Sequence, residues 1–254
     1  MKKIIFLLLT FIMCISLCSC SNSRLSKEEM LENSQELSID DMANTIKDNI
    51  INARNKYEGN TYKITGFITT INEDCVIINE FITAYLSQED LIQISNNQKV
   101  DIVGTIENID SKQVDTTLGG TSTTGTKITL EMKNSYLVND VYEINGVMNC
   151  RKNYKYVEGY TINYDWYCKI KAEDGEEYHL EDYIPEEDQH FNNTVNGLGE
   201  HAMVASDYGK GTATILGETF THLDKVTVSG NVYYEINGAK TEYNMKPVSI
   251  SKNN

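Results

Sequence analysis

The same short pattern occurs once in each half of this chain. Residues 99–106 read KVDIVGTI and residues 225–232 read KVTVSGNV. In both stretches apolar and polar residues alternate, as they do in a half-buried β-strand, and a glycine interrupts the alternation. A glycine inside a strand is typical of a bulge or a close backbone approach, and small barrels need such positions to coil their strands. The repeat therefore predicts two β-barrels of one architecture.

The first half has the order of elements of a small Greek-key barrel. An apolar stripe at helical spacing predicts one amphipathic helix that Ser38 caps and Gly59 ends. Five strands should follow, with a short helix capped by Ser87 between the third and the fourth. A loop rich in Gly, Thr and Ser should separate the last two strands. The expected strands lie near residues 62–69, 75–78, 81–86, 99–106 and 128–138, and the expected loop spans residues 115–126.

Three stretches of this half carry a family resemblance. They read YEGNTYKITGFI, ISNNQKVDIVGTI and ITLEMKNSYLV, and they lie within residues 38–138. They resemble the anticodon-binding-like (tRNA_anti-like) OB-fold domain that is found in many bacterial lipoproteins. The resemblance implies a five-stranded OB-fold barrel. It implies no catalytic residue, because the shared motifs are strand patterns with positioned glycines.

The second half repeats the pattern in a looser form. Asp174-Gly175 and Asn237-Gly238 predict tight hairpin turns, and residues 181–200 form an insertion where a helix would be expected. We predict a mainly β protein of tandem small Greek-key barrels, with an N-terminal amphipathic helix, an OB-fold at residues 38–139 and an OB-like barrel at residues 140–254. The alternative for the second half is an unrelated β-domain that shares one strand pattern by chance.

The N-terminus predicts export and lipidation. Lys2 and Lys3 precede an apolar run that ends in Leu17-Cys18-Ser19-Cys20, and this ending resembles the lipobox of bacterial lipoproteins. We expect a signal peptide at residues 1–19, a lipidated Cys20 and a polar tether with a short helix at residues 20–37. The protein should then be anchored in the cell membrane and face away from the cytoplasm. An ordinary cleaved signal or an uncleaved anchor is the alternative.

The charge of the chain counts against nucleic acid as its partner. Asp and Glu outnumber Lys and Arg by 37 to 22, which gives a formal net charge of −15. The arginines, Arg24, Arg54 and Arg151, are scattered. Binding to a phosphate backbone needs clustered Lys and Arg. A protein, peptide or glycan ligand suits this composition better.

Three cysteines follow Cys20, namely Cys75, Cys150 and Cys168. An odd number in an exported protein leaves at least one free thiol. Cys150 and Cys168 lie in the same half and could pair. The other interpretation is that all three are small buried apolar residues, as free cysteine usually is. The sequence leaves the choice open.

Aromatic residues gather in the second half, which holds the only tryptophan. A stacking platform for sugars or bases is one interpretation of this run, and ordinary strand composition is the other. Stacked bases would also need a basic groove, and the lysines nearby offer a modest one. The candidate ligand-binding residues are Tyr154, Tyr156, Tyr164, Trp166 and Tyr167.

The sequence offers no motif for catalysis, a metal or a cofactor. The four histidines, His179, His190, His201 and His222, match no compact metal-binding spacing. We therefore predict a non-catalytic, membrane-anchored binding module of unknown ligand. The first alternative is an OB-fold protein that binds single-stranded nucleic acid. The second is a hydrolase with carboxylates in the second half, since an acidic chain always offers some plausible pair.

Overall fold

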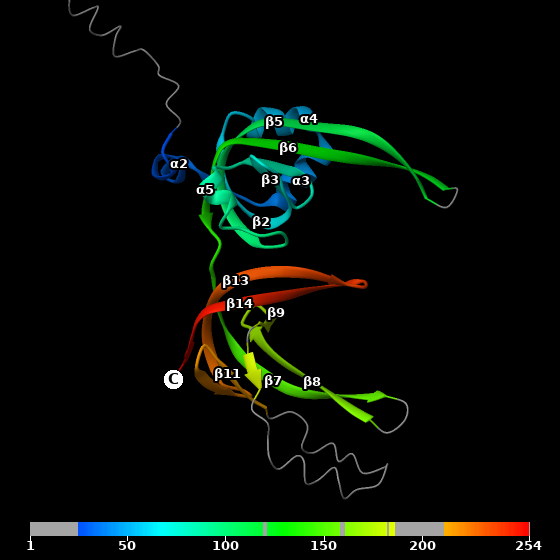
Figure 1. Ribbon diagram of the computed structural model, residues 1–254. Coiled ribbons are helices and arrows are strands. Elements are labelled where there is room, and N and C mark those ends of the chain that lie inside the picture. The colour runs from blue at the N-terminus through cyan, green and yellow to red at the C-terminus, as the bar shows by residue number, and fades with distance from the viewer. Residues whose placement is uncertain (1–24, 119–120, 158–160, 182, 186–210, 254) are drawn as a thin grey trace, which may run out of the picture.

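The computed structural model describes residues 25–118, 121–157, 161–181, 183–185 and 211–253. Within these ranges the chain forms two β-barrels, one above the other in Figure 1. A short linker at residues 140–141 joins the last strand of the first barrel to the first strand of the second.

The first barrel has five strands in the order of an OB-fold. Neighbouring strands follow the order β2-β3-β4-β6-β5, and β5 pairs back with β2. All these pairs are antiparallel except β4 with β6. A short helix, α5 (Gln88–Leu91), lies between the third and fourth strands, as the sequence predicts. The strands are β2 (Thr61–Ile71), β3 (Cys75–Ile78), β4 (Ile82–Tyr85), β5 (Lys99–Leu118) and β6 (Thr121–Asn139).

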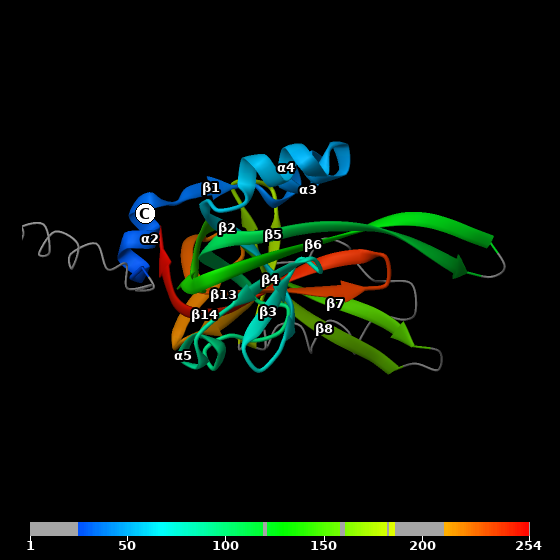
Figure 2. The same cartoon turned by 90° about the horizontal axis from the view of Figure 1, so that it is seen from above.

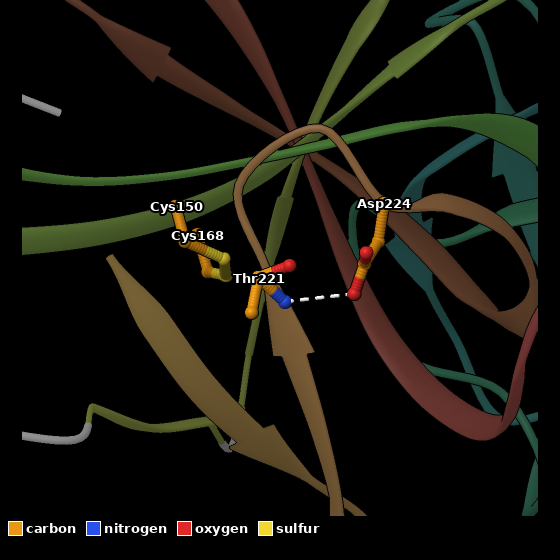
Figure 3. The surroundings of a disulfide bond; sticks show 4 residues. All are labelled: Cys150, Cys168, Thr221 and Asp224. Carbon is orange, nitrogen blue, oxygen red and sulfur yellow. Dashed lines mark hydrogen bonds between the residues drawn. A yellow bond between two sulfur atoms is a disulfide. The ribbon is translucent and has the colours of Figure 1, made fainter. Parts of the chain in front are cut away.

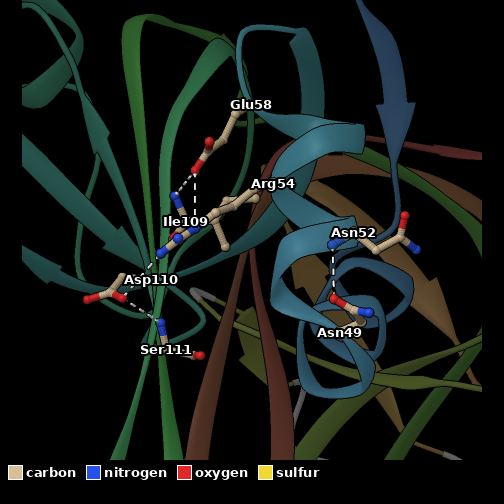
Figure 4. Close-up of polar contacts among 7 residues, drawn as sticks. All are labelled: Asn49, Asn52, Arg54, Glu58, Ile109, Asp110 and Ser111. Atoms are coloured by element: carbon tan, nitrogen blue, oxygen red, sulfur yellow. Dashed lines mark hydrogen bonds and ion pairs between the residues drawn. The ribbon is translucent and has the colours of Figure 1, made fainter.

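Two helices stand where the sequence predicts one. α3 (Ile39–Asp48) and α4 (Ile50–Tyr57) are separated by Asn49, whose backbone is extended. The side chain of Asn49 accepts a hydrogen bond from the backbone N–H of Asn52 at 3.1 Å and so caps α4 (Figure 4). The apolar stripe does not reveal such an internal cap, because both helices direct their apolar side chains into the same core and the stripe continues through Asn49. The prediction of one continuous helix is therefore wrong at Asn49.

The segment predicted as a tether is folded where the structure describes it. α2 (Lys27–Asn33) begins with a capping box between Ser26 and Glu29, and its Met30 is buried. β1 (Gln35–Leu37) then adds to the first barrel as a parallel neighbour of β2. The chain is thus held against the barrel well before residue 38.

The second barrel closes in the same order, β7-β8-β9-β14-β13, with β13 back on β7 and a parallel pair between β9 and β14. The predicted fold class of tandem OB-type barrels is therefore confirmed. Between its third and fourth strands, the described part of this barrel carries a small sheet of β10 (Tyr183–Pro185), β11 (Thr212–Ile215) and β12 (Glu218–Thr221). The barrel strands are β7 (Tyr142–Val157), β8 (Thr161–Ala172), β9 (Glu177–Leu180), β13 (Lys225–Asn237) and β14 (Lys240–Lys252).

The repeated octapeptide opens the fourth strand of each barrel. In both copies the ladder to the fifth strand shifts register at the glycine, near Gly104 in β5 and at Gly230 in β13. A Cβ atom at Gly104 would lie 2.5 Å from the Ser135 hydroxyl, and one at Gly230 would overlap the Lys246 carbonyl. Gly66 differs from this pattern, because no bulge occurs there and a Cβ would instead meet Ile78.

Three hairpins extend beyond the barrels as arms. They are the ends of β5–β6, β7–β8 and β13–β14, and all three project to the same side of the molecule (Figures 1 and 2). The β5–β6 arm corrects the predicted loop, because pairing continues from Asp110 with Thr129 out to Leu118 with Thr121. The threonines of this stretch are β-branched and suit a strand. Arg54 on α4 holds the base of this arm, because its Nε donates to the Ile109 carbonyl at 2.8 Å (Figure 4).

Candidate ligand-binding face

A row of polar side chains crosses the outer face of the second barrel. Side chains alternate between the core and the surface along each strand, and the strand register brings one outward residue from each of four strands into line. Lys169 of β8 pairs with His179 of β9, His179 with Asn244 of β14, and Asn244 with Tyr233 of β13. We call these four residues the outer row.

Carboxylates lie beside the outer row. Lys169 Nζ is 3.4 Å from Glu177 Oε2, and Asn244 Nδ2 donates to Glu235 Oε2 at 3.3 Å. Glu242 pairs directly with Glu235 across β13 and β14. Lys171 and Lys246 lie on the same outward side of β8 and β14, so this surface carries charges of both signs.

His179 is neutral at neutral pH. Burial lowers the pKa of His179, and the nearby Lys169 ammonium lowers it further. Glu242, Glu177 and Glu235 oppose this shift without reversing it. A neutral imidazole carries one donor and one acceptor nitrogen, so it can take part in uncharged hydrogen bonding to a ligand.

The outer row lies between the bases of two arms. From Lys169, β8 leads back along the strand into the β7–β8 arm. From Tyr233 and Asn244, β13 and β14 lead into their own hairpin turn. Both arms project to the same side in Figure 1, so the outer row lies on the strands from which both arms extend.

A disulfide between Cys150 and Cys168 closes the β7–β8 arm at its base (Figure 3). The two residues are direct partners in the ladder, their Cα atoms are 4.2 Å apart and both side chains are buried. The backbone N–H of Gly211 donates to the Cys150 carbonyl at 3.1 Å, which attaches the insertion to the same point. Beyond it, the Thr221 N–H donates to Asp224 Oδ2 at 2.8 Å (Figure 3). Cys75 is a buried free thiol in the first barrel.

The candidate aromatic residues all lie in the arm that this disulfide closes. Their backbones are paired across β7 and β8, but their side chains lie outside the part of the chain that the structure describes, so the stacking platform remains a prediction. The ladder places Tyr154 opposite Tyr164, Tyr156 opposite Ile162, Trp166 opposite Lys152 and Tyr167 opposite Arg151.

The first barrel has a shallow cavity of about 560 Å³ between β1, β2 and the start of α3. Lys63 in its wall is 3.3 Å from Glu36 Oε1 and 3.4 Å from Asp101 Oδ2. Burial alone would lower the pKa of Lys63, but Asp101 and Glu36 raise it. The ammonium group is thus already neutralised by the protein. The cavity is lined by Glu36, Leu37, Ser38, Ile39, Asp40, Lys63, Thr65 and Asn79.

The described ranges contain neither a candidate metal cluster nor a candidate membrane-spanning helix. No group of three or more His, Cys, Asp or Glu side chains there could hold a metal ion. No helix in those ranges is long and apolar enough to cross a membrane. Cys20, the predicted lipidation site, lies outside the described residues.

The strand order and the parallel pair that closes each barrel define the protein as a tandem OB-fold protein. The family model named tRNA_anti-like matches residues 1–116. The match covers the first barrel as far as β5 and agrees with the resemblance that its strand patterns predict.

A deletion mutant of the single-stranded DNA binding protein from Thermus aquaticus is a structural match. It aligns over 76% of this chain and 82% of that chain, with 7% sequence identity and a TM-score of 0.22. A likeness of this size supports no argument about function. No curated protein matches the chain in sequence.

The outer row could not be found from sequence motifs. Its members stand on four strands and belong to no local pattern. Of these residues, the sequence pointed to His179, which matched no compact metal-binding spacing, and to Lys169, one of the lysines near the aromatic run. The signal that could have found the row is strand register, since each member is an outward residue in a strand whose next residue faces the core.

Proposed function

We propose that the protein is a lipid-anchored, extracytoplasmic and non-catalytic binding module whose ligand lies on the outer row of the second barrel. The observation that carries this proposal is the alignment of Lys169, His179, Asn244 and Tyr233 across four strands. These side chains offer hydrogen-bond donors and acceptors to a ligand.

The charges of this face indicate the class of ligand. The carboxylates of Glu177, Glu235 and Glu242 share this face with lysines such as Lys169 and Lys171, so the face is not the one-signed basic surface that a polyanion needs. A neutral polar ligand such as a glycan, or a peptide with basic side chains, suits the face. Tyr233 adds an aromatic ring against which a sugar or an aliphatic chain could pack.

The disulfide supports the proposed location. Disulfides form and persist in oxidising compartments and are rare in the cytosol. The bond between Cys150 and Cys168 is thus consistent with export. The residues Leu17 to Cys20 give the proposed anchor its sequence basis.

Anchoring is tested by replacing the proposed lipidation site. The variant Cys20→Ser should leave the protein unprocessed or release it from the membrane fraction, because two acyl chains are needed for stable anchoring. The measurement is incorporation of radiolabelled palmitate together with cell fractionation. Continued labelling of the variant would contradict the proposal.

Binding of single-stranded nucleic acid is the second candidate. The OB-fold itself supports it, since OB-folds commonly bind oligonucleotides. So do the basic residues of the β7–β8 hairpin, which carries Arg151, Lys152, Lys155, Lys169 and Lys171. The overall charge of −15 argues against it.

One set of titrations separates the two candidates. The lipid-free chain is titrated with a fluorescent oligonucleotide at rising salt and, in parallel, with a panel of glycans and basic peptides. A nucleic-acid protein should lose oligonucleotide affinity steeply as salt rises. The proposed module should bind a member of the panel, and Asn244→Ala should weaken that binding. The variant Thr227→Ala, on the outer face of β13 beyond the row, is the matched control. Salt-sensitive oligonucleotide binding with no response from the panel would refute the proposal.

A further inference from the structure

Phe67 of the first barrel is an outward-facing aromatic residue that the second barrel covers. Its neighbours in β2, Gly66 and Ile68, face the first core, so the Phe67 ring points the other way. There it stacks on Tyr243 of β14, with ring centroids 5.8 Å apart and planes 18° apart. Tyr234 of β13 meets it edge-on at 5.2 Å.

The same contact completes the core of the second barrel. Phe67 packs against the buried cluster of that barrel, although it belongs to the first. Tyr243 in turn lies 5.8 Å from Tyr178 of β9. The two tyrosines come from strands β14 and β9, which also carry the outer row, but their rings lie on the other side of those strands. The same core also includes Ile215 and Phe220 of the small sheet, so Phe67 adds to cover that the second barrel already has.

A buried carboxylate ties the two barrels together. Asp101 of the first barrel is 7% exposed and accepts hydrogen bonds from the Thr65 and Tyr142 hydroxyls, both at 2.8 Å. Tyr142 is the first residue of the second barrel. Burial and the bond to Asp101 raise the pKa of Tyr142, so its hydroxyl stays protonated and remains a donor.

Main-chain and amide bonds add to this contact. The Tyr234 N–H donates to the Asn97 carbonyl at 3.0 Å, across the two barrels. Gln98, which is 1% exposed, donates to Asp140 Oδ2 at 3.4 Å. Asn231 donates to the backbone carbonyl of the same linker residue at 2.8 Å. The linker is therefore bonded on both sides.

We propose that the two barrels form one cooperative unit, in which Phe67 of the first barrel completes the core of the second. Two consequences follow. The face of β2 around Phe67 is closed to ligands while the unit is intact. The outer row and the arms of both barrels keep a fixed relative placement, so a ligand that touches both barrels meets a preformed surface and loses less entropy on binding.

The amide of Tyr234 tests this directly, because its hydrogen bond to Asn97 must break when the barrels separate. Hydrogen exchange of this amide is measured in the lipid-free full-length chain. Phe67→Ala should raise its exchange rate at least about tenfold, since an aromatic contact and its burial are lost. Phe81→Ala is the matched control, because Phe81 packs only on the first core. It should leave Tyr234 exchange nearly unchanged.

A second variant keeps the test decisive if Phe67→Ala does not fold. Tyr142→Phe removes one hydrogen bond to Asp101 and should raise Tyr234 exchange about threefold or more. Faster Tyr234 exchange in both variants, or in Tyr142→Phe alone when the other is unfolded, supports the proposal. Unchanged exchange in the folded variants, or an equal increase in the Phe81→Ala control, overturns it.

Discussion

Loss of the disulfide should destabilise the second barrel by a large amount. The bond joins residues 18 positions apart, and the chain-entropy model for a loop of this size gives about 3 kcal/mol at 25 °C. A typical domain has a free energy of unfolding of about 5–15 kcal/mol, so this is a substantial share. The loop contains the whole β7–β8 arm, and in the unfolded chain the bond restricts all of it.

Urea unfolding of the soluble chain from Ser21 onward measures this contribution. Trp166 is the only tryptophan and lies inside the closed loop, so its fluorescence reports on the second barrel. The double variant Cys150→Ala/Cys168→Ala should unfold with about 3 kcal/mol less free energy than the oxidised chain. Its m-value should rise slightly, because an uncrosslinked chain exposes more surface when it unfolds.

Thiol titration provides the control. The denatured, oxidised chain from Ser21 should show one free thiol, that of Cys75, and the reduced chain should show three. Three free thiols without reductant would show that the bond does not form. Superimposable urea curves for the oxidised chain and the double variant would refute the loop-entropy argument.

Two further predictions concern the barrel strands. Gly230→Val should lower the free energy of unfolding in urea by about 1–3 kcal/mol, because the new Cβ would overlap the backbone of Lys246. Gly125→Val is the control and should lower it little, because a Cβ there has nothing closer than 4.0 Å. Equal losses in the two variants would disprove the bulge argument. The pKa of His179 is lower in the folded chain than in the unfolded chain, where it is about 6.5. Its contribution to the free energy of unfolding is therefore fully present above about pH 6.5 and is lost as the pH falls below that value, because the unfolded chain then binds more protons. Comparing urea unfolding of the wild type and His179→Gln at pH 7.5 and 5.5 checks this, and a wild type that loses no more stability than the variant would contradict it.

The barrels could be predicted from the sequence because burial of one strand face produces a local alternation of apolar and polar residues. Every second residue of a barrel strand faces the core, so period two survives in the sequence, and glycine marks the places where strands crowd. The β5–β6 arm beyond residue 112 shows no such alternation, since its described side chains out to Gly125 are exposed on both faces. Its Thr- and Gly-rich sequence therefore resembled a loop.

The disulfide depended on register rather than on spacing. A hairpin that places Val157 opposite Thr161 necessarily places Cys150 opposite Cys168, but the sequence does not fix where β7 and β8 turn. The outer row is harder to predict from the sequence, because its alignment depends on the register of three strand pairs, one of them parallel. Long-range pairing of this kind is set by the closed barrel as a whole.

The two barrels share a topology and a bulge but divide their tasks. In the first barrel, α3 and α4 cover the core. The outward side of its strand β2 contacts the second barrel through Phe67. The second has its small sheet, whose Ile215 and Phe220 lie in its core, and Phe67 adds to this cover from the first barrel. The first barrel thus supports the second, and the second carries the outer row on which we expect a ligand.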